Sequence, residues 1–213
     1  MEWNCQTMSN HNEKSLQILQ AASRIFLTHG FSAATTDMIQ KEAKVSKATL
    51  YLCFPNKESM FAAVIENRCL EMKRIVSAID TRSSDIRQAL IDLGTAYLRF
   101  ILLPEGLSLF RVTVAEAPRF PELARKFYLT GPRTIVQIIA KRLEQAVEDQ
   151  QINVQQFGYD ISASLFVNML RGEGQMECLT HTQAQPSDVQ IDGWVHAAVT
   201  TFLLAFGTDK KSS

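Results

Sequence analysis

Paired cysteines, clustered histidines and an excess of charge of one sign are all missing from this chain of 213 residues. The cysteines, Cys5, Cys53, Cys69 and Cys178, form no C-x-x-C pair, and the four histidines are equally dispersed. Zinc and haem sites need ligands at short, fixed spacings, and scattered cysteines fit a reducing compartment. We therefore expect no metal, no cofactor and a cytoplasmic location.

Membrane segments and catalytic motifs are absent from the sequence as well. No apolar run reaches about 18 residues, and the N-terminal MEWNCQTMSNHNEK lacks the charged-then-apolar order of a signal peptide. The chain has no carboxylate pair, no Ser/His/Asp or Cys/His constellation and no glycine-rich phosphate loop. We expect no contact with a membrane, and nothing in the sequence supports an enzyme.

The net charge is zero, with 22 Lys and Arg against 22 Asp and Glu, so total charge gives no indication of nucleic-acid binding. The segment from Lys41 to Lys57 differs, because its four lysines accompany one glutamate, a net charge of +3. On charge alone, this segment is a solvated helical face. The caps and breakers within it favour a DNA-binding interpretation.

Apolar residues are plentiful, at 46% of the chain, and most recur at helical spacing with no competing strand pattern. The pattern predicts an all-α fold. Helices are expected from about Asn12 to Gly30, from Asn56 toward Ile79, from Ser83 or Ser84 to Phe100, after Pro104, Pro121 and Pro132, from Phe157 to Met169, and from Ser187 or Asp188 to Gly207. The stretch Gly172 to Pro186 is expected to be a loop.

Between the first two of these helices, the sequence predicts two short helices joined by a tight turn. Thr35 or Thr36 can cap the first, and Ser46 can cap the second. Pro55 removes a backbone donor and disfavours helical geometry at Phe54, so the second helix ends there. This layout is typical of a helix-turn-helix, whose second helix enters the major groove of DNA.

The candidate DNA-contacting residues lie at the N-termini of these short helices and on the second of them. Lysine and threonine side chains can donate to guanine or phosphate, alanine can touch a thymine methyl, and free helix amides favour phosphate. The predicted set is Thr36, Lys44, Ser46, Lys47, Ala48, Thr49, Tyr51 and Lys57.

Two motifs connect this segment to a known family. They are AAS-x-x-F-x-x-x-GF-x-x-x-TT-x-x-I from Ala21 to Ile39, and A-x-VSK-x-TLY-x-x-F-x-x-KE-x-x-F from Ala43 to Phe61. Together they closely resemble the N-terminal domain of TetR/AcrR-type transcriptional regulators over roughly 16–65. The resemblance implies an all-helical homodimer that binds a palindromic operator and a C-terminal domain whose small-molecule effector releases the DNA.

Three positions depart from the family pattern. Lys44 stands where the family usually has glycine, and a left-handed residue with a side chain costs about 1 kcal/mol there. Asp37 would place an acid near phosphates, although it also suits a helix N-terminus. Leu52 and Cys53 replace more usual aromatic or histidine residues, so phosphate contacts from those two positions are in doubt.

The expected organisation is a three-helix DNA-binding domain at 13–56 and a C-terminal helical bundle for ligand binding and dimerisation at 57–207. Residues 1–12 are expected to be a disordered tail, and 208–213 a second tail. A connecting helix begins at about Lys57.

A ligand pocket and a dimer interface are expected in the C-terminal part. The candidate pocket residues, which are large apolar groups with a few polar ones, are Tyr97, Phe100, Phe110, Arg111, Thr113, Phe127 and Phe166. The candidate interface residues, on the last two long helices, are Phe166, Met169, Leu170, Trp194, Ala198, Thr201, Phe202 and Ala205. For both sets the alternative is ordinary intramolecular core.

These features predict a ligand-responsive transcriptional regulator, a repressor, whose partners are double-stranded operator DNA, a largely apolar small-molecule effector and a second copy of the chain. A helical adaptor that binds protein, in which the helix-turn-helix is only a structural corner, is an alternative. An all-helical enzyme is a second alternative.

Overall fold

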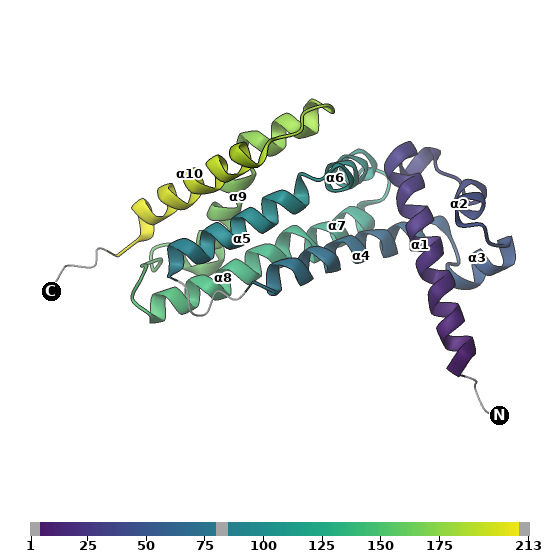
Figure 1. The fold of residues 1–213 in the computed structure, drawn as a ribbon, viewed down its shortest axis with the longest axis horizontal. Helices are drawn as coiled ribbons and strands as arrows, with labels where there is room; N and C mark the ends of the chain where they lie inside the picture. Colours follow the sequence, from purple (N-terminus) through teal and green to yellow (C-terminus); the bar gives the residue numbers. More distant parts are fainter. Residues whose placement is uncertain (1–4, 80–84, 209–213) are drawn as a thin grey trace. The chain divides into compact units, whose positions relative to one another are not determined.

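The computed structural model describes residues 5–79 and 85–208, with side chains from Glu13 onward. Within these ranges the only regular elements are helices, and one isolated antiparallel bridge joins Ile152 and Gly207 (Figure 1). The all-α prediction is confirmed. The helices are α1 (Cys5–Ala33), α2 (Thr36–Ala43), α3 (Lys47–Cys53), α4 (Lys57–Ser77), α5 (Ile86–Ile101), α6 (Pro104–Glu116), α7 (Pro121–Thr130), α8 (Pro132–Glu148), α9 (Gly158–Thr180) and α10 (Asp188–Phe206).

The chain forms two compact units, which divide it differently from the predicted boundaries at 13–56 and 57–207. Unit 1 comprises Met1–Cys69 and Ser108–Tyr128, and unit 2 comprises Leu70–Leu107 and Leu129–Ser213. The divisions fall inside α4, α6 and α7. A stretch from the middle of the sequence therefore belongs to the same unit as the helix-turn-helix.

Unit 1 is built around a cluster of aromatic rings. Phe26, Phe31 and Phe61 are fully buried, and their ring centroids lie 5.0 to 5.5 Å apart. Phe120 packs edge-on against Phe31 at 4.7 Å, and buried Leu109 belongs to the same core. Each ring removes a large apolar surface from water, so this cluster fixes α1 and α4 behind the two short helices.

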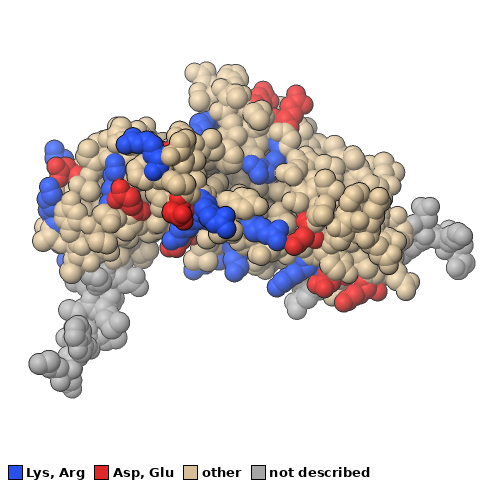
Figure 2. Space-filling model, turned by 180° about the vertical axis from the view of Figure 1, so that it is seen from behind, with Lys and Arg blue, Asp and Glu red and all other residues tan. Residues whose placement is uncertain are grey.

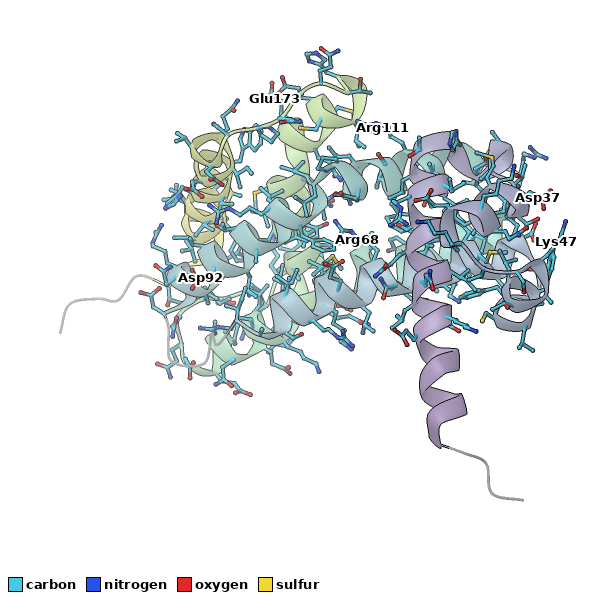
Figure 3. The ribbon with its side chains drawn as sticks, turned by 45° about the vertical axis from the view of Figure 1, so that its right-hand side comes forward. Asp37, Lys47, Arg68, Asp92, Arg111 and Glu173 are labelled. Atoms are coloured by element: carbon cyan, nitrogen blue, oxygen red, sulfur yellow. The ribbon has the colours of Figure 1, made fainter. Side chains whose placement is uncertain are left out.

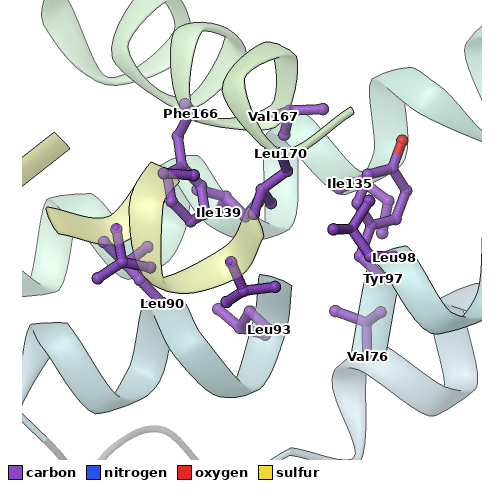
Figure 4. Packing of buried hydrophobic residues seen from close by; sticks show 14 of the residues in the cluster. Val76, Leu90, Leu93, Tyr97, Leu98, Ile135, Ile139, Phe166, Val167 and Leu170 are labelled. Carbon is purple, nitrogen blue, oxygen red and sulfur yellow. The ribbon is translucent and has the colours of Figure 1, made fainter. Parts of the chain in front are cut away.

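Unit 2 is a helical bundle in which α5 packs against α8, α9 and α10, and α9 packs against α8 and α10. Its core is almost wholly aliphatic and aromatic, as the close view in Figure 4 shows for Leu90, Ile139, Phe166 and Leu170. The apolar steps of three and four in the sequence point inward here, because residues at those spacings share one face of a helix.

Two helix starts and one end of the chain differ from the prediction. Helix α1 begins at Cys5, so part of the expected tail is helical, while 1–4 and 209–213 lie outside the described residues. The cap of α5 is Asp85, which accepts a hydrogen bond from the N–H of Gln88 at 2.8 Å; Ser83 and Ser84 lie outside the described residues. Thr208 is no tail residue, because its N–H donates to Gln151 O at 3.1 Å.

The prediction of a loop from Gly172 to Pro186 is wrong as far as Thr180. Gly172 has non-helical torsions, but α9 resumes beyond it and continues to Thr180. The resumed segment is held by burial of Cys178 and by the close approach of Gly174 to Trp194. A Cβ at Gly174 would lie 2.5 Å from Trp194 Cζ3, so only glycine fits against this ring.

Candidate nucleic-acid interface

Helix α2 begins and ends at the residues that the sequence singled out. Thr35 is the N-cap, and its Oγ1 accepts a hydrogen bond from the N–H of Met38 at 3.2 Å. Ile39 and Ala43 are buried on the inner face. Lys44 closes the helix in the left-handed conformation, at φ 50° and ψ 41°. The lysine side chain therefore leaves the turn at a position that usually favours glycine.

Helix α3 also begins and ends at the predicted residues. The Ser46 Oγ accepts a hydrogen bond from the N–H of Thr49 at 3.1 Å and lies 2.8 Å from Thr49 Oγ1. Leu50 is fully buried and anchors the helix to the unit 1 core. Phe54 is extended, and Pro55 follows it, so the helix ends as expected.

The opposite side of α3 is exposed and chemically mixed. Lys47 and Ala48 are exposed, Tyr51 is 42% exposed, and Leu52 is 74% exposed. Leu52 was absent from the predicted set, yet its spacing of four from Ala48 places it on the same face. A short helix that is buried on one side and free on the other has the geometry needed for insertion into a groove.

Two side-chain contacts tie α2 to this exposed face. Lys47 Nζ lies 2.9 Å from Asp37 Oδ1, and Thr36 Oγ1 lies 3.3 Å from the Tyr51 hydroxyl. Figure 3 shows Asp37 and Lys47 next to each other at the outer edge of the short helices. The hydrogen bond to Asp37, reinforced by its charge, raises the pKa of Lys47 above its usual value. Lys47 is therefore fully charged at neutral pH.

Lys57 has a structural position that the sequence did not reveal. Its Nζ donates to the carbonyl oxygens of Phe31 at 2.8 Å and Ala34 at 3.0 Å, and it lies 4.5 Å from the centre of the Phe31 ring. These contacts hold the ammonium group against the turn that joins α1 to α2. The predicted phosphate contact from this side chain would require them to break.

A second connection to the same turn comes from the end of α6. Glu116 accepts hydrogen bonds from the Ser32 N–H at 2.9 Å and from the Ser32 hydroxyl at 2.8 Å. Arg119 also donates to Ser32 Oγ, at 3.0 Å. Glu116 thus clamps a backbone turn that lies 84 residues away in sequence.

Comparison with known proteins decides the family. The model of "Bacterial regulatory proteins, tetR family" matches residues 18–64, and the model of "AefR-like transcriptional repressor, C-terminal domain" matches residues 88–208, more than half of the chain. The chain belongs to the TetR family of bacterial transcriptional regulators. The predicted resemblance is thus confirmed.

Individual relatives agree with this assignment. The Bacillus subtilis regulator YhgD is 40% identical over 57 residues, which span 27% of this chain and only 30% of YhgD. The solved structure of the flavonoid-responsive regulator FrrA is 30% identical, covers 93% of this chain and 99% of FrrA, and has a TM-score of 0.77. A TetR-family regulator of Mesorhizobium loti has a TM-score of 0.86 at 23% identity, over 93% and 98% of the two chains.

The residues expected to line the effector pocket of this TetR-family protein fall into different units. Tyr97, Phe100 and Phe166 are buried in the core of unit 2. Phe110, Arg111, Thr113 and Phe127 belong to unit 1, where the rings of Phe110 and Phe127 lie 6.1 Å apart. The seven residues do not form one wall within either unit, so a pocket that uses all of them stays an untested prediction.

Unit 2 contains a hollow of about 510 Å³ that none of those seven residues lines. Its walls come from α4, α8 and the start of α9, and they carry Lys73, Lys141, Glu144 and Tyr159. Asp160 at its edge pairs with Arg133 at 3.0 Å. Most of the lining surface is apolar, and the charged side chains at its wall are more numerous than the few polar groups expected of an effector pocket.

The residues expected at the dimer interface divide between core and surface. Phe166, Leu170, Ala198 and Phe202 are buried within the single chain, and Phe166 and Phe202 stack edge to face at 5.4 Å. These four side chains pack in the core of unit 2, which is the alternative that the sequence left open. Met169 and Trp194 are half-buried, while Thr201 and Ala205 are exposed. The exposed part of the predicted set remains available to a partner.

An apolar surface does remain on these two helices, at positions outside the predicted interface set. Leu204 on α10 is 83% exposed, and Ile161 and Leu165 on α9 are 56% and 41% exposed. Helix α10 is long and apolar enough to cross a membrane by length and composition alone, which is weak evidence because the core helix of a soluble protein passes the same test. Exposed apolar surface of this kind commonly marks a contact with a partner.

Proposed function

We propose that this TetR-family protein is a repressor that binds a palindromic operator as a homodimer and leaves it when a small, largely apolar effector binds. The observation that carries the DNA-binding part is the exposed face of α3, capped by Ser46 and anchored by buried Leu50. The repressor assignment follows the description of the matched C-terminal family model. Protein of this kind would act in the cytoplasm, where the DNA is.

In this proposal α3 enters the major groove with its first turn nearest the base edges. Lys47 and Thr49 would donate to bases, Ala48 and Leu52 would contact thymine methyl groups, and Tyr51 would reach the sugar-phosphate backbone. Thr36, Lys44 and the backbone N–H groups at Ser46 complete the contacts. Lys57 is left out, because carbonyl oxygens already hold its ammonium group.

Fluorescence anisotropy with the protein's own promoter fragment and a scrambled duplex tests this proposal. Lys47→Ala should weaken operator binding by about tenfold or more, since a base contact is worth about 1–3 kcal/mol, and Tyr51→Ala should also weaken it because a contact to the sugar-phosphate backbone is lost. Tyr128→Ala is the matched control, because Tyr128 is an exposed tyrosine of the same unit on α7. Equal operator and scrambled affinities in the unmodified protein would exclude the proposed function.

The second copy of the chain is proposed to cover the exposed apolar face of α9 and α10. Residues Ala197, Thr201 and Leu204 recur at steps of four and three along α10 and are all exposed. A twofold arrangement of such faces would place two α3 helices about one DNA turn, ~34 Å, apart on a palindromic site.

Size-exclusion chromatography with light scattering tests the dimer separately from DNA binding. Leu204→Glu should give a monomer, because it would bury two charges at the twofold interface. Leu103→Glu is the control, since Leu103 is an exposed leucine outside these two helices. A dimer that survives Leu204→Glu would remove α10 from the interface.

The proposed effector is a planar aromatic molecule with a few hydroxyl groups. This proposal rests on FrrA, whose name describes it as flavonoid-responsive and which shares 30% identity over 93% of the chain. Tyr97 supports it from unit 2, because this phenol is only 2% exposed in a largely apolar core and could exchange hydrogen bonds with such a ligand.

A panel of flavonoids and of saturated fatty acids would discriminate between effector classes. Flavonoids should raise the melting temperature and release operator DNA in the same concentration range, because a ligand shifts an equilibrium only by binding its two states unequally. Release by fatty acids alone would replace the aromatic effector with an aliphatic one. The absence of any effect from either class would remove the apolar effector from the proposal.

A further inference from the structure

The exposed face of α3 presents its most prominent cation already paired with an acid. Lys47 Nζ and Asp37 Oδ1 are 2.9 Å apart, and their side chains are 59% and 64% exposed (Figure 3). Both groups thus sit in solvent at the surface proposed to meet DNA. Their pairing contributes little to folding stability, because exposed ion pairs are screened by water and salt.

The other charges of this region have different placements. Lys57 is held by backbone carbonyls, and Glu42 is paired with Arg24 at 2.7 Å. Lys41 and Lys44 are exposed, and the described residues offer them no salt-bridge partner. These two lysines are therefore the cations best placed to contact phosphates, whereas Lys47 is already paired with Asp37. On the face shown in Figure 2, basic and acidic side chains are interspersed.

We propose that Asp37 is a specificity-determining residue, which acts with Lys47 to recognise a G·C base pair in the major groove and keeps Lys47 from serving as a general phosphate contact. The inference rests on the proposed DNA-binding function.

The chemistry of a G·C pair matches the paired side chains. In the major groove, guanine offers the acceptors O6 and N7, and cytosine offers the N4 amino group as a donor beside them. Lys47 supplies a donor for guanine, and Asp37 supplies an acceptor for cytosine, 2.9 Å away. An A·T pair does not reproduce this arrangement at the same positions, because the adenine N6 donor replaces guanine O6 opposite Lys47 and the thymine O4 acceptor replaces cytosine N4 opposite Asp37.

The carboxylate also acts against other binding modes. A phosphate near Asp37 would experience like-charge repulsion, and Lys47 would have to leave Asp37 to reach that phosphate. Non-specific complexes depend almost wholly on phosphate contacts, so they lose more from this acid than the specific complex does. Asp37 thus lowers general DNA affinity and raises the ratio of specific to non-specific binding.

The test compares full-length wild type with Asp37→Asn and Glu42→Gln. Both substitutions remove one negative charge from α2, but only the first removes the partner of Lys47. Dissociation constants are measured from 50 to 300 mM KCl for the promoter operator, for a scrambled duplex and for operators with each half-site G·C pair changed to A·T. Circular dichroism at each condition confirms that the variants are folded.

Asp37→Asn should bind the scrambled duplex about threefold to tenfold more tightly. The slope of log affinity against log salt concentration should steepen by about 0.9 per protomer, because Lys47 becomes a phosphate contact. The specificity ratio should fall by about tenfold. Wild type should lose about tenfold in affinity when one particular G·C pair is changed. Asp37→Asn should tolerate that change, and Glu42→Gln should behave like wild type.

Two results would overturn the inference alone while leaving the proposed function intact. One is selective wild-type binding with an unchanged specificity ratio in Asp37→Asn. The other is an equal effect of Glu42→Gln, which would mean that general electrostatics explain the change. Wild-type protein that binds operator and scrambled duplex equally would overturn the proposed function, and this inference with it.

Discussion

Replacing Lys44 with glycine should make the protein more stable and its DNA binding weaker. Lys44 closes α2 with φ 50° and ψ 41°, a conformation that costs a residue with a side chain about 1–2 kcal/mol. Glycine removes this cost, but it also gives the unfolded chain more conformational freedom, which lowers the free energy of unfolding by about 0.5–1 kcal/mol. The expected net stabilisation is about 0.5–1 kcal/mol.

The same substitution removes a charge from the proposed DNA-contacting surface. If each Lys44 contacts one phosphate, a dimer loses two contacts, and the salt dependence of operator binding should become shallower by about 1.8. Lys44→Ala is the matched control, because alanine removes the same charge but keeps the Cβ. It should weaken DNA binding as much as glycine does, without the gain in stability.

Urea unfolding followed by circular dichroism, at one fixed protein concentration, measures the stability of both variants. A glycine variant no more stable than the alanine variant would show that this residue is not held in the left-handed conformation. Equal losses of stability in both variants would show that the lysine side chain has packing contacts. An unchanged salt dependence in both would remove Lys44 from the phosphate contacts.

Three further predictions test the fold. Ser46→Ala should lower the free energy of unfolding by about 1 kcal/mol in urea, because α3 loses its N-cap. Gly174→Ala should cost about 1–3 kcal/mol and change tryptophan emission, since the new Cβ meets the rigid Trp194 ring at 2.5 Å; Gly94→Ala, whose nearest neighbour is the flexible end of a leucine at 3.0 Å, should cost less. Burial raises the pKa of the Tyr97 hydroxyl above 10.0, so the folded state binds the hydroxyl proton more tightly than the unfolded state does. The free energy of unfolding should therefore fall as the pH rises beyond about 10. Tyr97→Phe should lessen that fall, which urea unfolding at about pH 8 and about pH 10.5 would measure.

The DNA-contacting segment could be predicted from sequence because its signals are local. Thr35 and Ser46 each accept the capping hydrogen bond that their position predicts, and Pro55 ends α3 where its missing N–H requires. Each of these effects acts within about four residues, so a single sequence contains the information for it.

The predictions that failed depend on contacts between distant segments. Glu116 clamps Ser32 across 84 residues, and no spacing rule connects such positions. Gly172 breaks helical torsions as expected, but burial of Cys178 restores the helix beyond it. The apolar residues of α9 and α10 are a similar case. Periodicity shows that a helix has a wide apolar arc, but it does not show which residues of that arc, such as Phe202, pack inside the same chain.

The inclusion of Ser108–Tyr128 in unit 1 has a practical consequence for protein engineering. A chimera that fuses the first 69 residues to a foreign effector domain would discard Leu109, the Glu116 clamp on Ser32 and the ring that covers Phe31. The transplanted DNA-binding segment would then expose aromatic surface to water beside the turn that joins α1 to α2. A chimera that exchanges the effector domain of this protein should therefore keep Ser108–Tyr128 together with the N-terminal helices.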